Sequence, residues 1–211
     1  VGSYSIDFKN LFQVEFCNDN LITASGMNGY IIKTEPDGEN WNNINIPTGN
    51  HADIMDFTDE QTGYVFAGNG QWFKTGDGGN SWTPILEWPN IHIEGLAVPS
   101  VNKIVTGGWG GAMSISDDGG FYFPYPDNSL SKCVNSISNM SFYDDKNGLA
   151  GSYVGELYRT ADGGINWTKI ENPMADVKKK INDIYYVTDQ ILFAGGTSGN
   201  IIKSENGGLS W

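Results

Sequence analysis

One short pattern occurs five times along the chain at nearly regular intervals, and it constrains the fold more than any other feature of the sequence. Each copy begins with Ser or Thr, has an acidic or amide residue two or three positions later, a glycine at the fifth position and an aromatic residue at the eighth. The copies span residues 34–41, 75–82, 116–123, 160–167 and 204–211. Their acidic or amide residues are 40, 41, 44 and 44 positions apart, a period that suits a four-stranded blade of a β-propeller.

The rest of each period repeats as well, and it predicts three strands before each copy of the pattern. A short strand precedes the pattern directly, a strand ending in small residues and glycine lies before that one, and an inner strand with apolar residues at alternate positions comes first. The alternating residues are Phe12/Val14/Phe16, Met55/Phe57, Leu96/Val98, Met140/Phe142 and Tyr185/Val187. With an outer strand that starts at the aromatic residue, each period forms one blade of four antiparallel strands.

The two ends of the chain predict how the ring closes. An outer strand follows four copies of the pattern, whereas the sequence ends at Trp211, the last residue of the fifth copy. Residues 2–8 precede the first inner strand, and we expect them to supply the missing strand and remove the exposed sheet edge. The predicted fold is therefore all-β: one domain over residues 1–211, a five-bladed β-propeller closed by the N-terminal strand. The alternative is a fragment of a seven-bladed ring.

The residues of the repeated pattern have a local structural chemistry. The carboxylate or amide can accept hydrogen bonds from backbone amides of its own turn, the glycine permits a positive φ, and the aromatic residue can bury a large apolar face under the hairpin. The expected structural residues are Asp37, Asp77, Asp118, Asp162 and Asn206. The pattern resembles the Asp-box, also called the bacterial neuraminidase repeat, and the resemblance covers essentially the whole chain.

Composition argues against several classes of function. The net charge is −13 and the only arginine is Arg159, whereas nucleic-acid binding needs clustered Lys and Arg. No apolar stretch approaches the roughly 18 residues of a membrane span, so no membrane insertion is expected. The two cysteines, Cys17 and Cys133, lack metal-ligand spacing, and we expect no metal and no cofactor. We also expect a monomer.

The first residue bears on where the protein is found. The chain begins with Val1 rather than methionine, which favours removal of a leader and an extracytoplasmic or secreted location. A viral particle or a compartment like the thylakoid lumen would also fit this interpretation.

The loops between the second and third strands of the blades are framed by glycines and share one face of a propeller, opposite the repeated turns. Trp109 lies in such a loop with two glycines on either side, Tyr153 falls in the same loop of the next blade, and Trp88 precedes the third blade. Neighbouring exposed aromatic residues form a stacking surface for sugars or an anchor for a protein partner. The alternative is that each side chain folds back over the edge of its blade as part of the core.

The inner strands carry a second group of candidates near the channel mouth. Phe12, Asp53, Glu94, Ser138 and Asp183 occupy what the alternation makes equivalent positions, and His51 and His92 come two residues before Asp53 and Glu94. Converging carboxylates can raise one another's pKa for acid–base work, and with histidine they could hold a cation. The alternative is a polar, water-filled channel whose acids are solvated and hydrogen-bonded to the histidines.

Two families carry this repeat. Sialidases and related glycosidases use several arginines to bind the substrate carboxylate, and a chain with Arg159 alone cannot build that cluster. The segments 63–82 and 148–167 are similar to the photosystem II stability/assembly-factor family, whose members are non-enzymatic propellers that bind a protein. That resemblance implies a binding or scaffold module for a protein or glycan partner. The alternatives are a glycoside hydrolase-like enzyme that uses Asp53, Glu94 and Asp183, or a purely structural domain of a secreted or virion assembly.

Overall fold

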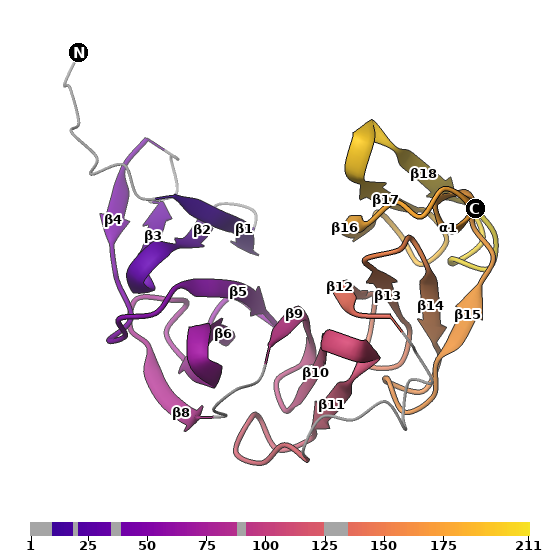
Figure 1. The fold of residues 1–211 in the computed structure, drawn as a ribbon. Helices are drawn as coiled ribbons and strands as arrows, with labels where there is room; N and C mark the ends of the chain where they lie inside the picture. The colour runs from indigo at the N-terminus through magenta and orange to yellow at the C-terminus, as the bar shows by residue number, and fades with distance from the viewer. Residues whose placement is uncertain (1–9, 19–20, 35–38, 88–91, 125–134) are drawn as a thin grey trace. The chain divides into compact units, whose positions relative to one another are not determined.

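The computed structural model describes residues 10–18, 21–34, 39–87, 92–124 and 135–211, and their regular structure is almost entirely β (Figure 1). The strands form five antiparallel sheets, each built from strands that follow one another along the chain. These sheets are the five blades of a β-propeller, which confirms the predicted fold class. Three of the sheets have the predicted four strands, and the third and fifth along the chain have three among the described residues. The strand that was expected to close the ring lies outside the described residues, and the single domain over residues 1–211 stays a prediction.

The chain divides into two compact units, Val1–Asn90 with blades one and two and Ile91–Trp211 with blades three to five. The strands of the first unit are β1 (Leu11–Asn18), β2 (Leu21–Gly26), β3 (Ile31–Thr34) and β4 (Trp41–Asn43) in blade one, and β5 (Ala52–Phe57), β6 (Gly63–Ala67), β7 (Gln71–Thr75) and β8 (Thr83–Glu87) in blade two. The strands of the second unit are β9 (Ile93–Ser100), β10 (Lys103–Gly108) and β11 (Met113–Ser116) in blade three, β12 (Ile137–Phe142), β13 (Gly148–Ser152), β14 (Leu157–Thr160) and β15 (Thr168–Ile170) in blade four, and β16 (Ile181–Tyr186), β17 (Leu192–Gly196) and β18 (Ile201–Ser204) in blade five.

Short helical turns connect some of these strands. Each is a single turn, and all but one join the second and third strands of a blade. They are η1 (Met27–Gly29), η2 (Gly68–Gly70), η3 (Trp109–Gly111), η4 (Thr197–Gly199) and α1 (Pro173–Asp176), which lies between β15 and β16.

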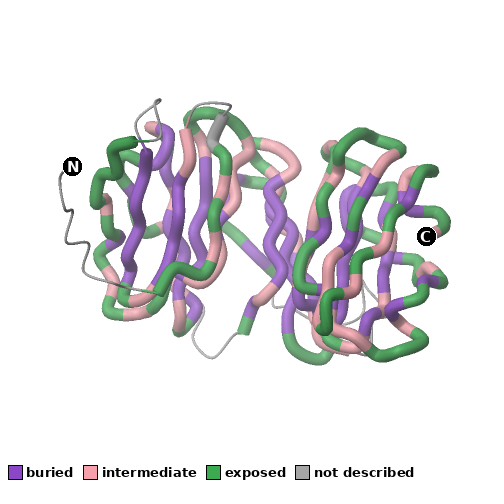
Figure 2. Tube along the Cα trace, turned by 90° about the horizontal axis from the view of Figure 1, so that it is seen from above, coloured by how far each residue is buried: buried purple, intermediate pink, exposed green. Residues whose placement is uncertain are grey.

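The core of each unit lies between neighbouring blades, because each sheet buries one face against the next. In the first unit, Ile31 of blade one packs with Met55 and Phe73 of blade two. In the second unit, Val105 of blade three packs in one cluster with Ile137 of blade four. Figure 2 shows that the buried stretches lie along strands. Exposed residues occur at the turns and also on strands, as in β4, whose three residues are all exposed, and in β18.

The repeated turns share one network of hydrogen bonds, which blade four illustrates. The Thr160 hydroxyl donates to Asp162 Oδ1 over 2.8 Å and accepts from the Gly164 backbone N–H over 2.9 Å, while Asp162 Oδ1 accepts from the Asn166 N–H over 2.9 Å. The same bonds form around Asp77, Asp118 and Asn206. The predicted capture of backbone amides is thus present in four turns, and Asp37 of the first copy lies outside the described residues.

The aromatic residue that ends each pattern is buried in three of the blades. Trp82, Phe123 and Trp167 are at most 8% exposed, as the pattern predicts. Trp41 is 41% exposed and Trp211 is half-buried, so the expected burial is wrong for Trp41. The pattern determines the position of the aromatic residue at the end of the turn. Whether its side chain is buried depends on a neighbouring surface that covers it.

Candidate functional site

Every first strand contains a β-bulge near its beginning. The bulge marks one equivalent position in each blade, at the end of the sheet where the loop between the second and third strands lies. The pairing with the second strand skips one residue in each blade. The skipped residues are Phe12, Asp53, Glu94, Ser138 and Asn182. A bulge leaves its residue unpaired and re-aims its side chain, and bulges are common beside functional sites.

The position of the bulge in blade five shows that the predicted placement of Asp183 is wrong. Asp183 does not occupy the bulge position of blade five, because Asn182 does, and Asp183 pairs with Gly195 instead. Its side chain is exposed, and its Oδ1 accepts a hydrogen bond from the Ile184 N–H over 2.9 Å. Only Asp53 and Glu94 therefore carry a carboxylate at this position.

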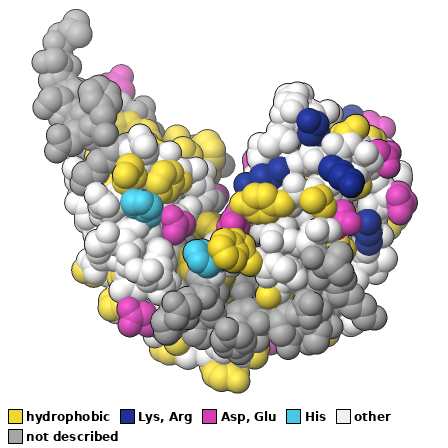
Figure 3. All heavy atoms as spheres, in the orientation of Figure 1, with side chains coloured by type: hydrophobic (Ala, Val, Ile, Leu, Met, Phe, Trp, Pro, Cys, Tyr) yellow, Lys and Arg dark blue, Asp and Glu magenta, His cyan; other side chains and the backbone are white. Residues whose placement is uncertain are grey.

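Trp109 is the most prominent side chain on the loop side of blade three. It opens the tight turn η3 after β10, is 60% exposed, and stacks on the His92 ring at a centroid distance of 4.1 Å and an interplanar angle of 9°. Figure 3 shows histidine side chains beside hydrophobic ones on one face. His92 can meet it because Ile93, the next residue, pairs with Gly108, which directly precedes Trp109. The exposed indole is thus held flat on a partner ring rather than folded into the core.

Glu94 joins Trp109 to the next blade. The Trp109 indole N–H donates to Glu94 Oε1 over 3.2 Å, and the Tyr153 hydroxyl donates to Glu94 Oε2. One carboxylate therefore fixes an aromatic side chain from blade three and another from blade four. Because both of its oxygens already accept a hydrogen bond, Glu94 acts here to orient the two rings.

Tyr153 lies in the loop between β13 and β14, and residues of blades three to five surround it. It is 40% exposed, its backbone N–H donates to the Ser136 carbonyl over 3.0 Å, and the Lys180 ammonium lies 4.2 Å from the centre of its ring. Partial burial, the hydrogen bond to Glu94 and the negative charge of Glu94 together raise the pKa of Tyr153 to about 12. The phenol therefore stays neutral at physiological pH and keeps its proton for Glu94.

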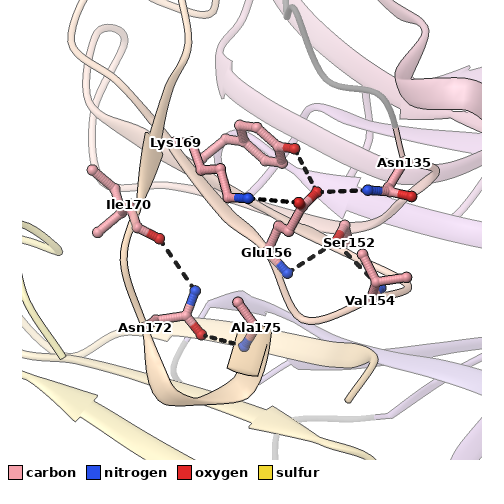
Figure 4. Close-up of polar contacts among 9 residues, drawn as sticks. Asn135, Ser152, Val154, Glu156, Lys169, Ile170, Asn172 and Ala175 are labelled. Carbon is pink, nitrogen blue, oxygen red and sulfur yellow. Dashed lines mark hydrogen bonds and ion pairs between the residues drawn. The ribbon is translucent and has the colours of Figure 1, made fainter. Parts of the chain in front are cut away.

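A second carboxylate, that of Glu156, holds the loop of Tyr153 in place (Figure 4). Glu156 accepts hydrogen bonds from Lys169 of β15 over 2.7 Å, from the Tyr158 hydroxyl over 2.6 Å and from Asn135 over 2.9 Å. Burial opposes the charge, but these three bonds hold the pKa of Glu156 below its usual value. The side chain of Ser152 adds two backbone bonds inside the loop, to the N–H groups of residues 154 and 156. The loop that presents Tyr153 is thus pinned from several sides.

The contact between Tyr153 and Glu94 predicts an alkaline titration. In the Glu94→Gln variant, we expect the pKa of Tyr153 to fall from about 12 toward the ordinary value of 10.0, because the charge that opposes a phenolate is gone. Because the pKa of Tyr153 is raised in the folded protein, the folded protein holds this proton at a pH where the unfolded chain releases it. The contribution of Tyr153 to the free energy of unfolding is therefore lost as the pH rises from about 10 to about 12.

Ultraviolet titration of tyrosinate measures this pKa, with the Tyr153→Phe variant identifying the step that belongs to Tyr153. If the step removed by Tyr153→Phe has the same midpoint with Glu94 and with Gln at position 94, the two side chains do not interact in solution.

The remaining predicted residues are placed as follows. His51 belongs to the first unit, where its Nδ1 accepts a hydrogen bond from the Asn28 N–H over 3.2 Å and its ring packs edge-on against Phe12 at 5.5 Å. Asp53 is half-buried in the same unit. Trp88 lies outside the described residues.

Within the part of the chain that the structure describes, no cluster of three or more His, Cys, Asp and Glu side chains is arranged to hold a metal ion. Among the same residues, no helix is long and apolar enough to cross a membrane.

Lys180 was not among the residues predicted from the sequence, although the register of the strands places it at the site. In four blades the carbonyl of the residue directly before the first strand accepts a hydrogen bond from a loop N–H at the same end of the sheet, as His51 does from Gly68 and Lys180 does from Thr197. The pairing of Ile93 with Gly108 places His92 at the same position of blade three. Lys180 is therefore the blade-five equivalent of His51 and His92. The sequence does contain a signal for this position, because Lys180 is the last of three lysines and directly precedes β16. Hydrophobic alternation alone did not show where β16 begins.

Comparisons with known proteins agree with the fold. Neither a protein-family model nor a curated protein matches the sequence. Among solved structures, YCF48 from Cyanidioschyzon merolae is similar with a TM-score of 0.70 and 17% identity, over 97% of this chain and 72% of that one. A structure of YCF48 bound to a D1 peptide gives a TM-score of 0.54 and 15% identity, over 96% and 80% of the two chains.

The GH74 xyloglucanase from Xanthomonas campestris is similar as well, with a TM-score of 0.66 and 15% identity, over 90% of this chain and 35% of the enzyme. The solved structures to which this chain is similar thus include a peptide-bound propeller and an enzyme. At identities this low, the likeness shows a shared β-propeller fold.

Proposed function

We propose that this chain is a non-catalytic binding module that engages a protein or glycan partner through the loop face of its second unit, which we define as Trp109, His92, Glu94, Tyr153 and Lys180. The observation that carries this proposal is the state of Trp109, which is 60% exposed yet fixed by stacking on one side and by a hydrogen bond from its indole N–H. An aromatic side chain that is ordered before binding loses little conformational entropy when it is covered.

The chemistry of the loop face suits both kinds of partner. Trp109 offers a flat apolar surface to a sugar ring or to an apolar side chain, and Lys180 adds a positive charge beside Tyr153. A propeller of this fold is known with a bound peptide, the YCF48 structure with its D1 peptide, which supports a protein partner for this chain. We also propose that the repeated turns are Asp-boxes, because four of them share the same hydroxyl, carboxylate or amide, and glycine bonds.

The enzymatic alternative has less support from the geometry. Asp183 lies one residue away from the equivalent of Glu94, so the three carboxylates do not occupy equivalent positions as the enzymatic alternative expected. Arg159, the only arginine, donates from Nε to the Gly207 carbonyl over 3.1 Å and from Nη2 to Asn147 over 3.3 Å, which makes it a brace between blades four and five. A sialidase-like arginine cluster is thus not proposed. The extracytoplasmic location and the monomeric state stay predictions.

The proposal predicts that Trp109→Ala removes binding. A glycan array and a pull-down with the chain as bait would identify a ligand, and we expect its affinity to fall roughly 30-fold or more in the variant, the effect of losing a central anchor. Trp41→Ala is the matched control, since Trp41 is an exposed tryptophan of the first unit. Binding that Trp109→Ala leaves unchanged would overturn the assignment of the loop face, the absence of any ligand would favour a purely structural domain, and turnover of a glycan that Glu94→Gln abolishes would favour the enzyme.

A further inference from the structure

Blade five exposes an apolar sheet face. Tyr185 of β16, Phe193 of β17 and Ile201 of β18 are 65%, 38% and 73% exposed. Tyr185 pairs directly with Phe193, and Ile201 pairs with Gly195, two residues after Phe193 on β17. Paired residues of an antiparallel sheet point to the same side, as do residues two apart on one strand, so the three side chains are neighbours on one face. We call these three residues the blade-five face.

The same three positions of blade three are buried under the following blade. The strand pairings make the equivalents in blade three Ala97, Val105 and Met113. These side chains are 2%, 0% and 1% exposed and pack in one cluster with Met140 of blade four. At these positions, blade three therefore carries the apolar side chains that the next blade covers.

Blade four repeats this arrangement. Leu149 and Leu157 hold the positions that correspond to Phe193 and Ile201. Both leucines are 0% exposed and lie in one cluster with Ile184 of blade five. Single exposed apolar residues are normal on protein surfaces, but the blade-five face repeats a pattern that two other blades bury against a neighbour.

Polar side chains border the blade-five face. Asp183 lies two residues before Tyr185, and Lys203 pairs with Phe193, so both are on the same side of the sheet. Both are exposed, and Lys203 forms an ion pair with Glu205. An apolar centre with a polar rim is the usual composition of a protein–protein interface.

Blade one exposes a complementary surface. Val14 and Phe16 of β1 are 55% and 67% exposed, and Trp41 at the start of β4 is 41% exposed. We call these three residues the blade-one face. Val14 is the second residue after the bulge, and its equivalents in blades two, four and five are Met55, Met140 and Ile184. Those equivalents are at most 5% exposed, because each packs against the preceding blade.

The aromatic residues of blade one indicate the same kind of contact. In blade four, Phe142 packs edge-on against Trp167 at 5.9 Å, and both belong to the packing that joins blades three and four. Phe16 and Trp41 are the same two residue types at the same two positions of blade one. Blade one thus presents the side chains with which blade four packs against the blade before it.

We propose that the blade-five face binds the blade-one face of a second copy of this chain. Such a contact repeats the packing of one blade on the next that already forms the core of each unit, and this continuity selects a second copy as the occupant. Because two different surfaces meet, the contact is head-to-tail, and further copies can add at either end. The proposal goes beyond the binding assigned to the loop face, and it predicts self-association where the sequence led us to expect a monomer.

Sedimentation velocity over a wide range of protein concentrations tests the proposal with variants that damage one face each. Ile201→Lys places a charge on the blade-five face, and Val14→Lys places one on the blade-one face. Val177→Lys is the matched control, because Val177 is 54% exposed and belongs to neither face. Circular dichroism checks that the variants fold, which we expect because the replaced side chains are exposed.

We expect the average mass of the parent and of Val177→Lys to rise alike with concentration, and Ile201→Lys and Val14→Lys each to associate at least about tenfold more weakly. An equimolar mixture of those two variants should form dimers, because each copy supplies the face that the other lacks. A parent that stays monomeric at every concentration would overturn the proposal. So would a Val14→Lys variant that associates by itself as the parent does, or a mixture that associates no better than its components.

Discussion

Replacing Trp167 with alanine should destabilise the chain by about 3–5 kcal/mol, the usual cost of emptying a buried aromatic site. Trp167 is 6% exposed, packs edge-on against Phe142 at 5.9 Å and belongs to the core cluster between blades three and four. Its indole N–H donates to the Gly164 carbonyl over 2.7 Å, so the substitution also removes a hydrogen bond that fastens the turn to the sheet. Urea denaturation followed by circular dichroism would measure the loss as a lower midpoint.

The matched control is Trp41→Ala, the same residue type at the same position of the repeated pattern. Because Trp41 is 41% exposed, we expect that variant to lose less than about 1 kcal/mol. Comparable losses in the two variants would contradict this account, since the motif alone would then set the effect. A large difference would show that the aromatic residue of the turn contributes to the free energy of unfolding mainly through the packing of blade three against blade four.

The sequence predicts the strands and turns well because their chemistry is local. In the turn of blade four, the hydroxyl of Thr160, the carboxylate of Asp162 and the amide of Gly164 lie within four residues, so the pattern itself specifies the bonds. The exposure of Trp109 is local too, because Trp109 directly follows Gly108, the last residue of β10, and opens a turn instead of lying within the sheet.

The site was predicted less completely, because its contacts join different blades. Glu94 and Tyr153 are 59 residues apart, and only the packing of blade three on blade four brings the carboxylate to the phenol. No spacing rule within one repeat indicates such a contact. The same holds for Lys180, which reaches Tyr153 from blade five.

The incorrect placement of Asp183 has a different cause. The run Ile184-Tyr185-Tyr186-Val187 is apolar at every position, so alternation cannot select which residues face the core. In the structure Ile184 is buried and Tyr185 is exposed, the reverse of what the expected alternation requires. The structure aligns Tyr186 with Phe142 of blade four, since each is the fourth residue after the bulge and pairs with the start of the second strand, whereas the expected alternation aligned Val187 with Phe142.

Replacing Gly155 with alanine should cost about 2–4 kcal/mol and disturb the loop that presents Tyr153. Gly155 has a φ of +83°, and a Cβ at this residue would lie 2.3 Å from the Met174 carbonyl oxygen and 2.8 Å from that of Lys179. Both contacts are with backbone atoms, so the clash cannot be relieved by a rotating side chain, and the strain of a positive φ adds to it. Urea denaturation would measure the destabilisation.

Gly110→Ala separates the two causes, because Gly110 has a φ of +64° but no atom within 4 Å of an added Cβ. Strain alone should then cost about 1 kcal/mol, the usual penalty for a left-handed alanine. If Gly155→Ala lowers the free energy of unfolding no more than Gly110→Ala does, the backbone at Met174 shifts easily to make room for the new side chain. The loop of Tyr153 is then not held by that segment. A clearly larger cost would show that the backbone of the segment before blade five is part of what holds Tyr153 against Glu94. Binding through the loop face should then weaken in Gly155→Ala even where the variant stays folded.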